Sequence, residues 1–124
     1  MAPISKTEAF PVSISPEVVR ERVMAWCEPL RPTVVADTPD RLEVKTGSQA
    51  KLRLLGGAFI AATSLPTRMV VTTEVVDGAT QVTVMASDAI GFGAKTGIKG
   101  KYELRVAEVV AELRAALTAP ASAS

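Results

Sequence analysis

The chain has 124 residues, with 14 basic and 13 acidic side chains, one cysteine and no histidine. This length is typical of a single domain, and 48% hydrophobic against 22% charged residues is the balance of a folded protein. Because histidine is absent, the chain cannot form a Ser-His-Asp or Cys-His nucleophile or an ordinary zinc site. We therefore expect no metal, no other cofactor and no catalytic residues, and a binding protein rather than an enzyme.

Compartment and partner class follow from the same composition. The first residues lack the apolar core of a secretory signal, and the longest apolar stretch, residues 54–62, is far short of the about 20 residues of a membrane helix. The lone Cys27 fits a reducing compartment, because it leaves no disulfide within the chain. A formal net charge of +1 argues against a nucleic-acid partner. We expect a cytoplasmic protein with neither a membrane span nor a nucleic-acid partner.

The N-terminal part of the chain predicts a strand followed by a helix. An alternating apolar pattern over residues 9–14 indicates a half-buried strand, after a flexible stretch at residues 1–7. Ser15 supplies a capping hydroxyl and Pro16 suits the first helical position, so a helix is expected to run to about Glu28. Its apolar face, which we expect to enter the core, comprises Val19, Val23, Trp26, Cys27 and Leu30.

Short strands joined by turns come next. Residues 34–35 and 41–45 are predicted strands around a turn at residues 37–40, and a strand at residues 51–54 is expected to pair with the second of them. The clearest hairpin surrounds Asp77-Gly78, the strongest short turn signal. Its strands are residues 68–76 and 80–87. A register with Val76 opposite Ala79 places Val71 opposite Val84 on an apolar face, as a sheet covered on one side requires.

A long amphipathic helix is expected at residues 101–118, followed by a disordered tail at residues 119–124. Its apolar stripe comprises Tyr102, Val106, Val109, Val110, Leu113 and Leu117. The charged residues that fall mostly outside the stripe are Glu103, Arg105, Glu108, Glu112 and Arg114. The elements predict one domain over residues 8–118, an α+β fold of the order β-α-β(4–5)-α, in which a curved antiparallel sheet carries the long C-terminal helix on one face.

This order of elements resembles the helix-grip group, which includes the SRPBCC and START-like domains and, more broadly, the TATA-binding-protein-like β-α-β-α arrangement. Residues 10–19 read FPVSISPEVV, which is similar to the entrance strand, Ser-Pro-Glu turn and Val-rich first helix of SRPBCC proteins. The resemblance implies an apolar ligand held between the sheet and the last helix, and some members of the group are enzymes such as polyketide cyclases. The pocket lining that we expect comprises Phe59, Val71, Val84, Phe92, Val109 and Leu113.

A glycine-rich loop at residues 91–97 departs from the nucleotide-binding patterns. Thr96 stands where the dinucleotide pattern needs its third glycine, and Ala94 rather than glycine precedes Lys95. Lysines nevertheless gather where the last helix begins, and they either bind a phosphate or an acidic partner together with backbone N–H groups or belong to a solvated connection. These lysines are Lys95, Lys99 and Lys101.

Three functional hypotheses remain open. The first is a small binding module that takes an apolar small molecule between sheet and helix. The second is a protein-interaction or self-assembly module without a cavity, including a homodimer, based on the apolar segment at residues 57–65 and the outward positions Leu55, Val70 and Met85. The third is an enzyme that works with acids alone, for which the sequence supplies no convincing pair of polar groups.

Overall fold

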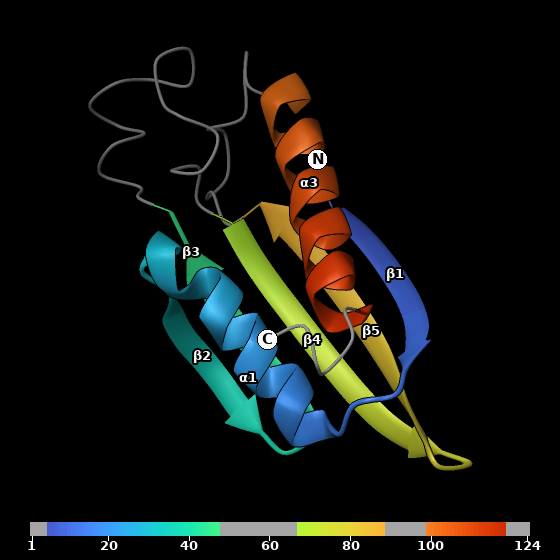
Figure 1. Ribbon diagram of the computed structural model, residues 1–124. Helices are drawn as coiled ribbons and strands as arrows, with labels where there is room; N and C mark the ends of the chain where they lie inside the picture. The colour runs from blue at the N-terminus through green and yellow to red at the C-terminus, as the bar shows by residue number, and fades with distance from the viewer. Residues whose placement is uncertain (1–4, 48–66, 89–98, 119–124) are drawn as a thin grey trace.

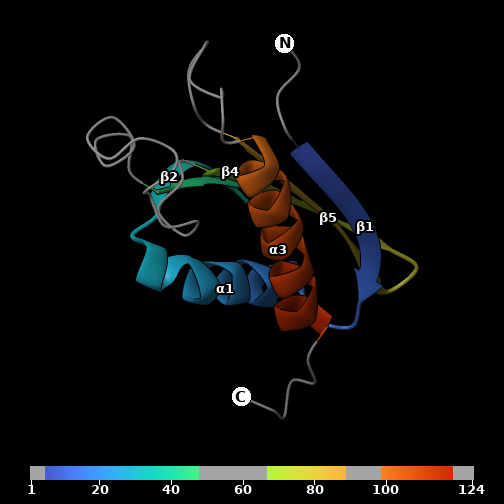
Figure 2. The ribbon, with the colours of Figure 1, turned by 90° about the horizontal axis from the view of Figure 1, so that it is seen from above.

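The computed structural model describes residues 5–47, 67–88 and 99–118. Its elements are β1 (Ser5–Val12), α1 (Pro16–Cys27), the 3-10 helix η1 (Glu28–Leu30), β2 (Thr33–Thr38), β3 (Arg41–Thr46), β4 (Thr67–Val76), β5 (Ala79–Asp88) and α3 (Lys99–Thr118). The strands form a five-stranded sheet in the order β1-β5-β4-β3-β2, and every neighbouring pair is antiparallel (Figure 1). Both helices lie on the same side of this curved sheet (Figure 2). The predicted α+β fold with a long C-terminal helix on one face is confirmed.

The start of α1 follows the local signals in the sequence. The Ser15 side chain accepts a hydrogen bond from the backbone N–H of Val18 at 3.3 Å, and Pro16 occupies the first turn. The helix ends at Cys27, and the chain continues as the 3-10 turn η1, after which Arg31 adopts a left-handed conformation with φ 54°. The cap, the proline and the predicted end of the helix are therefore correct to within one residue.

The β4–β5 hairpin has the predicted register. Val76 pairs with Ala79 and Val71 pairs with Val84. The turn residues Asp77 and Gly78 have φ values of 52° and 80°, which is the left-handed pair that an Asp-Gly turn favours because its twist matches that of the strands. Because successive side chains of a strand point to opposite faces, this register directs both Val71 and Val84 toward the helices.

Two strand predictions need correction. The first strand begins at Ser5 and ends at Val12, rather than spanning residues 9–14, because eight consecutive residues pair with β5. The predicted pairing of residues 41–45 with residues 51–54 is wrong, because β3 pairs with β2 on one side and with β4 on the other. A strand has two hydrogen-bonding edges, so β3 has none left for a third partner.

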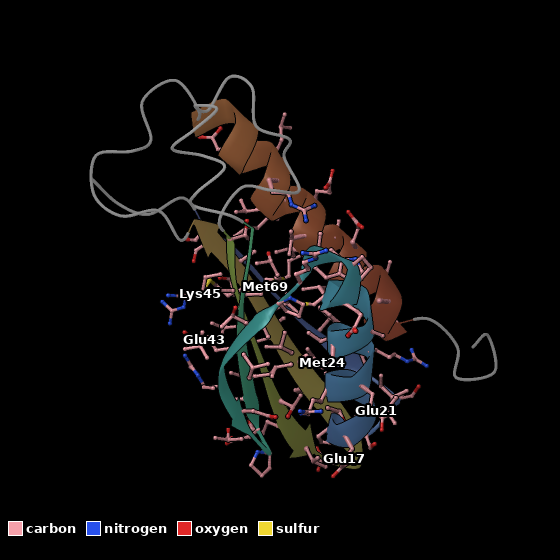
Figure 3. All side chains as sticks on the ribbon, turned by 90° about the vertical axis from the view of Figure 1, so that its left-hand side faces the viewer. Glu17, Glu21, Met24, Glu43, Lys45 and Met69 are labelled. Carbon is pink, nitrogen blue, oxygen red and sulfur yellow. The ribbon has the colours of Figure 1, made fainter. Side chains whose placement is uncertain are left out.

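The core lies between the sheet and the two helices. From α3 it receives Val106, Val109, Val110, Leu113 and Leu117, each exposing 3% or less of its surface. On β3 and β4, Val44 pairs with Met69 on the helix side of the sheet, whereas Glu43 and Lys45 project from the outer face (Figure 3). The apolar stripe predicted for the last helix is thus confirmed at these five positions.

Side chains also tie the two helices together and hold α1 to the edge of the sheet. Arg22 Nη1 donates to the backbone oxygen of Ala116 at 3.0 Å, which joins α1 to the end of α3. Arg20 Nε donates to Asp37 Oδ1 at 2.9 Å, which joins α1 to β2. The helices therefore form one layer with α1 against α3, rather than two separate supports for the sheet.

Candidate functional site

The pocket residues predicted from the sequence divide into two groups. Val71 and Val84 face each other across β4 and β5, and Val109 and Leu113 lie on the buried face of α3; all four belong to one hydrophobic cluster. Val84, Val109 and Leu113 have no exposed surface at all. The two predicted aromatic members, Phe59 and Phe92, lie outside the described residues.

Two hollows of the described part lie away from the centre of this cluster. The first holds about 20 Å³, roughly one water molecule, and lies where the start of α1 meets the turn between β2 and β3. The second measures about 560 Å³ and is lined by polar side chains of β3, β4, β5 and the same turn. Val71 lines the first, but neither hollow is lined by Val84, Val109 or Leu113.

A charged side chain lies buried at the contact between α1 and α3. Arg105 exposes 3% of its surface, although the helical stripe places it among the polar residues of α3. Its guanidinium lies 5.8 Å from the centroid of the Trp26 ring on α1. The indole Nε1 of Trp26 in turn donates to Glu112 Oε1 at 3.2 Å. The polar flank of α3 is therefore covered by α1 at this point.

The hydrogen bonds of Arg105 are incomplete. Its Nη1 donates to Glu108 Oε1, one turn farther along α3, and that carboxylate side chain is 51% exposed. Its Nε is buried and has no hydrogen-bond partner. A guanidinium carries five N–H donors in a rigid fork, and burying a donor without a partner costs free energy. Arg105 is thus a buried, partly satisfied cation between α1 and α3, which makes it the main candidate functional residue of the described part.

A second ionic group lies on the outer face of the sheet. Glu43 lies between Arg41 and Arg68, with 2.9 Å from its Oε1 to Arg41 Nη2 and 2.9 Å from its Oε2 to Arg68 Nε. Hydrogen bonds from Arg68 and then from Arg41 hold the pKa of this carboxyl below its ordinary value, because they stabilise the charged form. In this group one carboxylate bridges two arginines and thereby links β3 to β4, so we interpret it as a stabilising network rather than a binding site.

Cys27 is a free, buried thiol in the core cluster, as the sequence predicts. Burial raises the pKa of this thiol to about 11, because an apolar environment disfavours the thiolate. Among residues 5–47, 67–88 and 99–118, no group of three or more His, Cys, Asp or Glu side chains could hold a metal ion. No helix in the same ranges is long and apolar enough to cross a membrane.

The predicted anion-binding lysines stay untested. Lys95 lies outside the described residues, and Lys99 and Lys101 lie in the first turns of α3, where only the backbone is described. Their joint action on a phosphate remains a prediction.

Comparisons with solved structures identify the fold. No family model and no curated protein matches the chain. Protein MLL2253 from Mesorhizobium loti is 11% identical over 91% of this chain and 96% of its own, with a TM-score of 0.54. The Aha1 dimer from Colwellia psychrerythraea is 11% identical over 92% of this chain and 96% of its own, with a TM-score of 0.53. The chain has the helix-grip fold. At this identity the likeness shows the fold alone.

In this helix-grip fold, Arg105 is the feature that sequence reasoning missed. The helical stripe assigns α3 one apolar face toward the sheet and leaves Arg105 outside it. The one available signal was Trp26, a large aromatic on the first helix that must bury against some neighbour. Placing it against Arg105 requires knowing that α1 packs beside α3.

Proposed function

We propose that this chain is a small, non-catalytic binding module that holds an apolar small molecule between the sheet and α3. The observation that carries the proposal is the apolar opposition of two surfaces, with Val71 and Val84 on the sheet and Val109 and Leu113 on α3, within one buried cluster. Apolar linings with few polar groups are typical of small-molecule sites. The helix-grip arrangement supports the same position for the ligand.

Neither of the two hollows described above lies at the centre of this cluster, so the proposal includes a movement of α3 relative to the sheet when the ligand enters. The link between α3 and α1 sets the resistance to that movement, through Arg22 at one end and Trp26 farther along. The ligand must be small and flexible, because Val71, Val84, Val109 and Leu113 are packed in one buried cluster and leave room only when the helix shifts.

Native mass spectrometry and calorimetric titration test this function. We expect purified protein to retain an apolar molecule or, once stripped by organic extraction and refolded, to bind decanoic acid or decanol with one molecule per chain. Val109→Trp fills the proposed site and should abolish this binding, whereas the exposed Leu104→Trp on the same helix, which is 77% exposed, should leave it unchanged. Absence of any retained molecule together with no binding of either probe would reject the function.

A second candidate is a self-association module, and the exposed apolar residues of β2 favour it. Val34 and Val35 are 43% and 49% exposed on this edge strand of the sheet. Unpaired strand edges with apolar side chains are templates for pairing with another chain. The similar protein from Colwellia psychrerythraea was itself solved as a dimer.

The outward positions named from the sequence contribute less to this second candidate. Val70 is only 6% exposed and Met85 is half-buried, while Leu55 and residues 57–65 lie outside the described part of the chain. Sedimentation equilibrium of wild type and Val35→Lys decides the question. A dimer that the substitution dissociates supports self-association through β2, and a wild-type monomer at high concentration rejects it.

A further inference from the structure

Arg105 differs from the other arginines whose ion pairs the structure shows. Arg20, Arg41, Arg68 and Arg114 reach acidic partners with 40% or more of their side chains exposed. Arg68 also has a buried Nε, but that atom lies 2.9 Å from Glu43 Oε2, and the rest of its side chain is open to water. The Arg105 side chain is only 3% exposed, and its buried Nε has no hydrogen-bond partner. The charge is therefore retained at a place where it costs stability.

The immediate surroundings of the guanidinium provide one aromatic ring and one acidic partner. The guanidinium of Arg105 lies over the ring of Trp26, which attracts its positive charge. The ring does not accept hydrogen bonds from the N–H groups at the edge of the guanidinium. Glu112 is already bonded to the Trp26 indole. Glu108 is bonded to Nη1 alone, and its side chain is half-exposed, so a second acidic group would compete with it for Arg105 while the Glu108 carboxylate turns to water. The guanidinium thus carries unused donors and one replaceable partner.

Arg105 also lies next to the proposed ligand site. It precedes Val106 and stands one turn before Val109, both of which are buried in the core cluster. An apolar molecule between the sheet and α3 would therefore place one of its ends within reach of this charge. Arginine binds carboxylates and phosphates through paired N–H···O contacts, which are strongest where water is excluded.

We infer that Arg105 binds the anionic head group of the ligand, so that this chain selects an apolar acid over a neutral apolar molecule of the same length. The inference rests on the proposed function. The acidic oxygens would receive hydrogen bonds from Nε and from one Nη of Arg105, and Trp26 would hold the guanidinium plane in position.

Calorimetric titration of three probes tests the inference. Decanoic acid, decyl phosphate and decanol share one apolar chain and differ in the head group, so the first two distinguish a carboxylate from a phosphate. We expect the preferred acid to bind the wild type about tenfold more tightly than decanol, or better, as a charge-assisted hydrogen bond provides. Fluorescence of Trp26, the single tryptophan of the chain, should change with the acids more than with decanol.

Variants of two arginines on the same helix provide the control. Arg105→Gln should bring the acids to the affinity of decanol while decanol binding is kept. Arg114→Gln removes an exposed arginine that pairs with Glu8 and should keep the wild-type preference. Should Arg105→Gln unfold, Arg105→Met keeps the shape of the side chain without its charge and should show the same loss.

The outcomes separate the two proposals. Equal binding of acids and decanol by the wild type, or an unchanged preference in Arg105→Gln, overturns the inference and leaves the proposed function standing. Binding of none of the three probes overturns the proposed function and the inference with it.

Discussion

Arg105 on α3 lies with its guanidinium 5.8 Å from the ring centroid of Trp26 on α1, so one helix covers a charge that belongs to the other. Because α1 packs against Arg105, the contact between the two helices determines how far this charge is buried. The consequences for stability can be measured without any ligand.

Replacing Arg105 by methionine should stabilise the ligand-free protein. The change removes a buried charge with an unpartnered Nε and keeps a long apolar side chain in its place. Substitutions of this kind are neutral to stabilising, and we expect the free energy of unfolding in urea to rise by about 1 kcal/mol. Arg114→Met, which breaks an exposed ion pair with Glu8, should lower it by about 0.5 kcal/mol. A loss of stability in Arg105→Met would assign the arginine a structural role.

Replacing Glu108 by glutamine should lower the free energy of unfolding, in contrast to Arg105→Met. The Glu108 side chain is 51% exposed, and an ordinary exposed position tolerates such a change within about 0.5 kcal/mol. Here the carboxylate is the acidic partner of a buried guanidinium, so its neutralisation should cost about 1–3 kcal/mol. Urea unfolding of the single and double variants with Arg105→Met measures the coupling. Additive effects would show that the pair does not interact.

A third prediction concerns the contribution of the buried pocket residues to stability. Val84 has no exposed surface, so Val84→Ala should lower the free energy of unfolding by about 2–3 kcal/mol through lost burial and the remaining void. Val75 lies on the same helix-facing side of the sheet but is 61% exposed beyond the reach of the helices. Val75→Ala is therefore the matched control and should change stability by less than about 0.5 kcal/mol. Thermal or urea unfolding distinguishes the two, and equal effects would contradict the described core.

The comparison of these two valines shows what the sequence could predict. The apolar alternation around the Asp77-Gly78 turn determines both the register and the face of Val71, Val75 and Val84, because a one-residue slip would reverse every side chain. It does not determine how far the helices reach along that face, so Val75 appears equivalent to Val84 in the sequence. The burial of Arg105 is unpredictable for the same reason, since it depends on the contact of two helices that are distant in the chain.

The strand order shows a related limit. Local turn signals favour pairing between sequence neighbours, and for β2–β3 and β4–β5 this rule holds. It fails where the chain leaves β3 at Thr46 and returns as β4 at Thr67, because 20 residues separate the two strands and the turn residues among them, such as Gly47 and Pro66, do not identify the later partner. Loop closure over such a length costs little extra entropy, so the longer connection is accessible to the fold.

Acidic pH should destabilise the protein through Glu43. Because its pKa in the folded state is lowered by Arg68 and Arg41, the stabilisation is complete above the ordinary value of about 4.5 and is lost as the pH falls through the folded-state pKa. Both arginines are partly exposed, so Glu43→Gln should cost about 1 kcal/mol at pH 7. Unfolding curves of variant and wild type should converge at low pH. Glu21→Gln on the exposed side of α1 is the control. If the difference in stability between wild type and Glu43→Gln stayed the same at every pH, the ion pairs of Glu43 with Arg41 and Arg68 would be contradicted.

The thiol of Cys27 should be protected in the folded protein. Its pKa is raised to about 11 by burial, so the thiolate is scarce at pH 8 and reagents cannot reach it. We expect alkylation by iodoacetamide to proceed only as fast as the protein opens and to become rapid in concentrated urea. Because the folded state holds this proton more tightly than the unfolded state, stability should also fall as the pH rises from 9 toward 11. Rapid labelling of the folded chain would contradict its burial.

The central claim is that the helix-grip fold of this chain binds an apolar molecule between its sheet and α3. Native mass spectrometry of the stripped protein after incubation with decanoic acid tests it most directly, because it counts bound molecules and protomers in one spectrum. We expect the wild-type chain to carry one molecule of decanoic acid and Val109→Trp to carry none. A spectrum that shows only the unliganded chain, or equal binding by wild type and Val109→Trp, would contradict it.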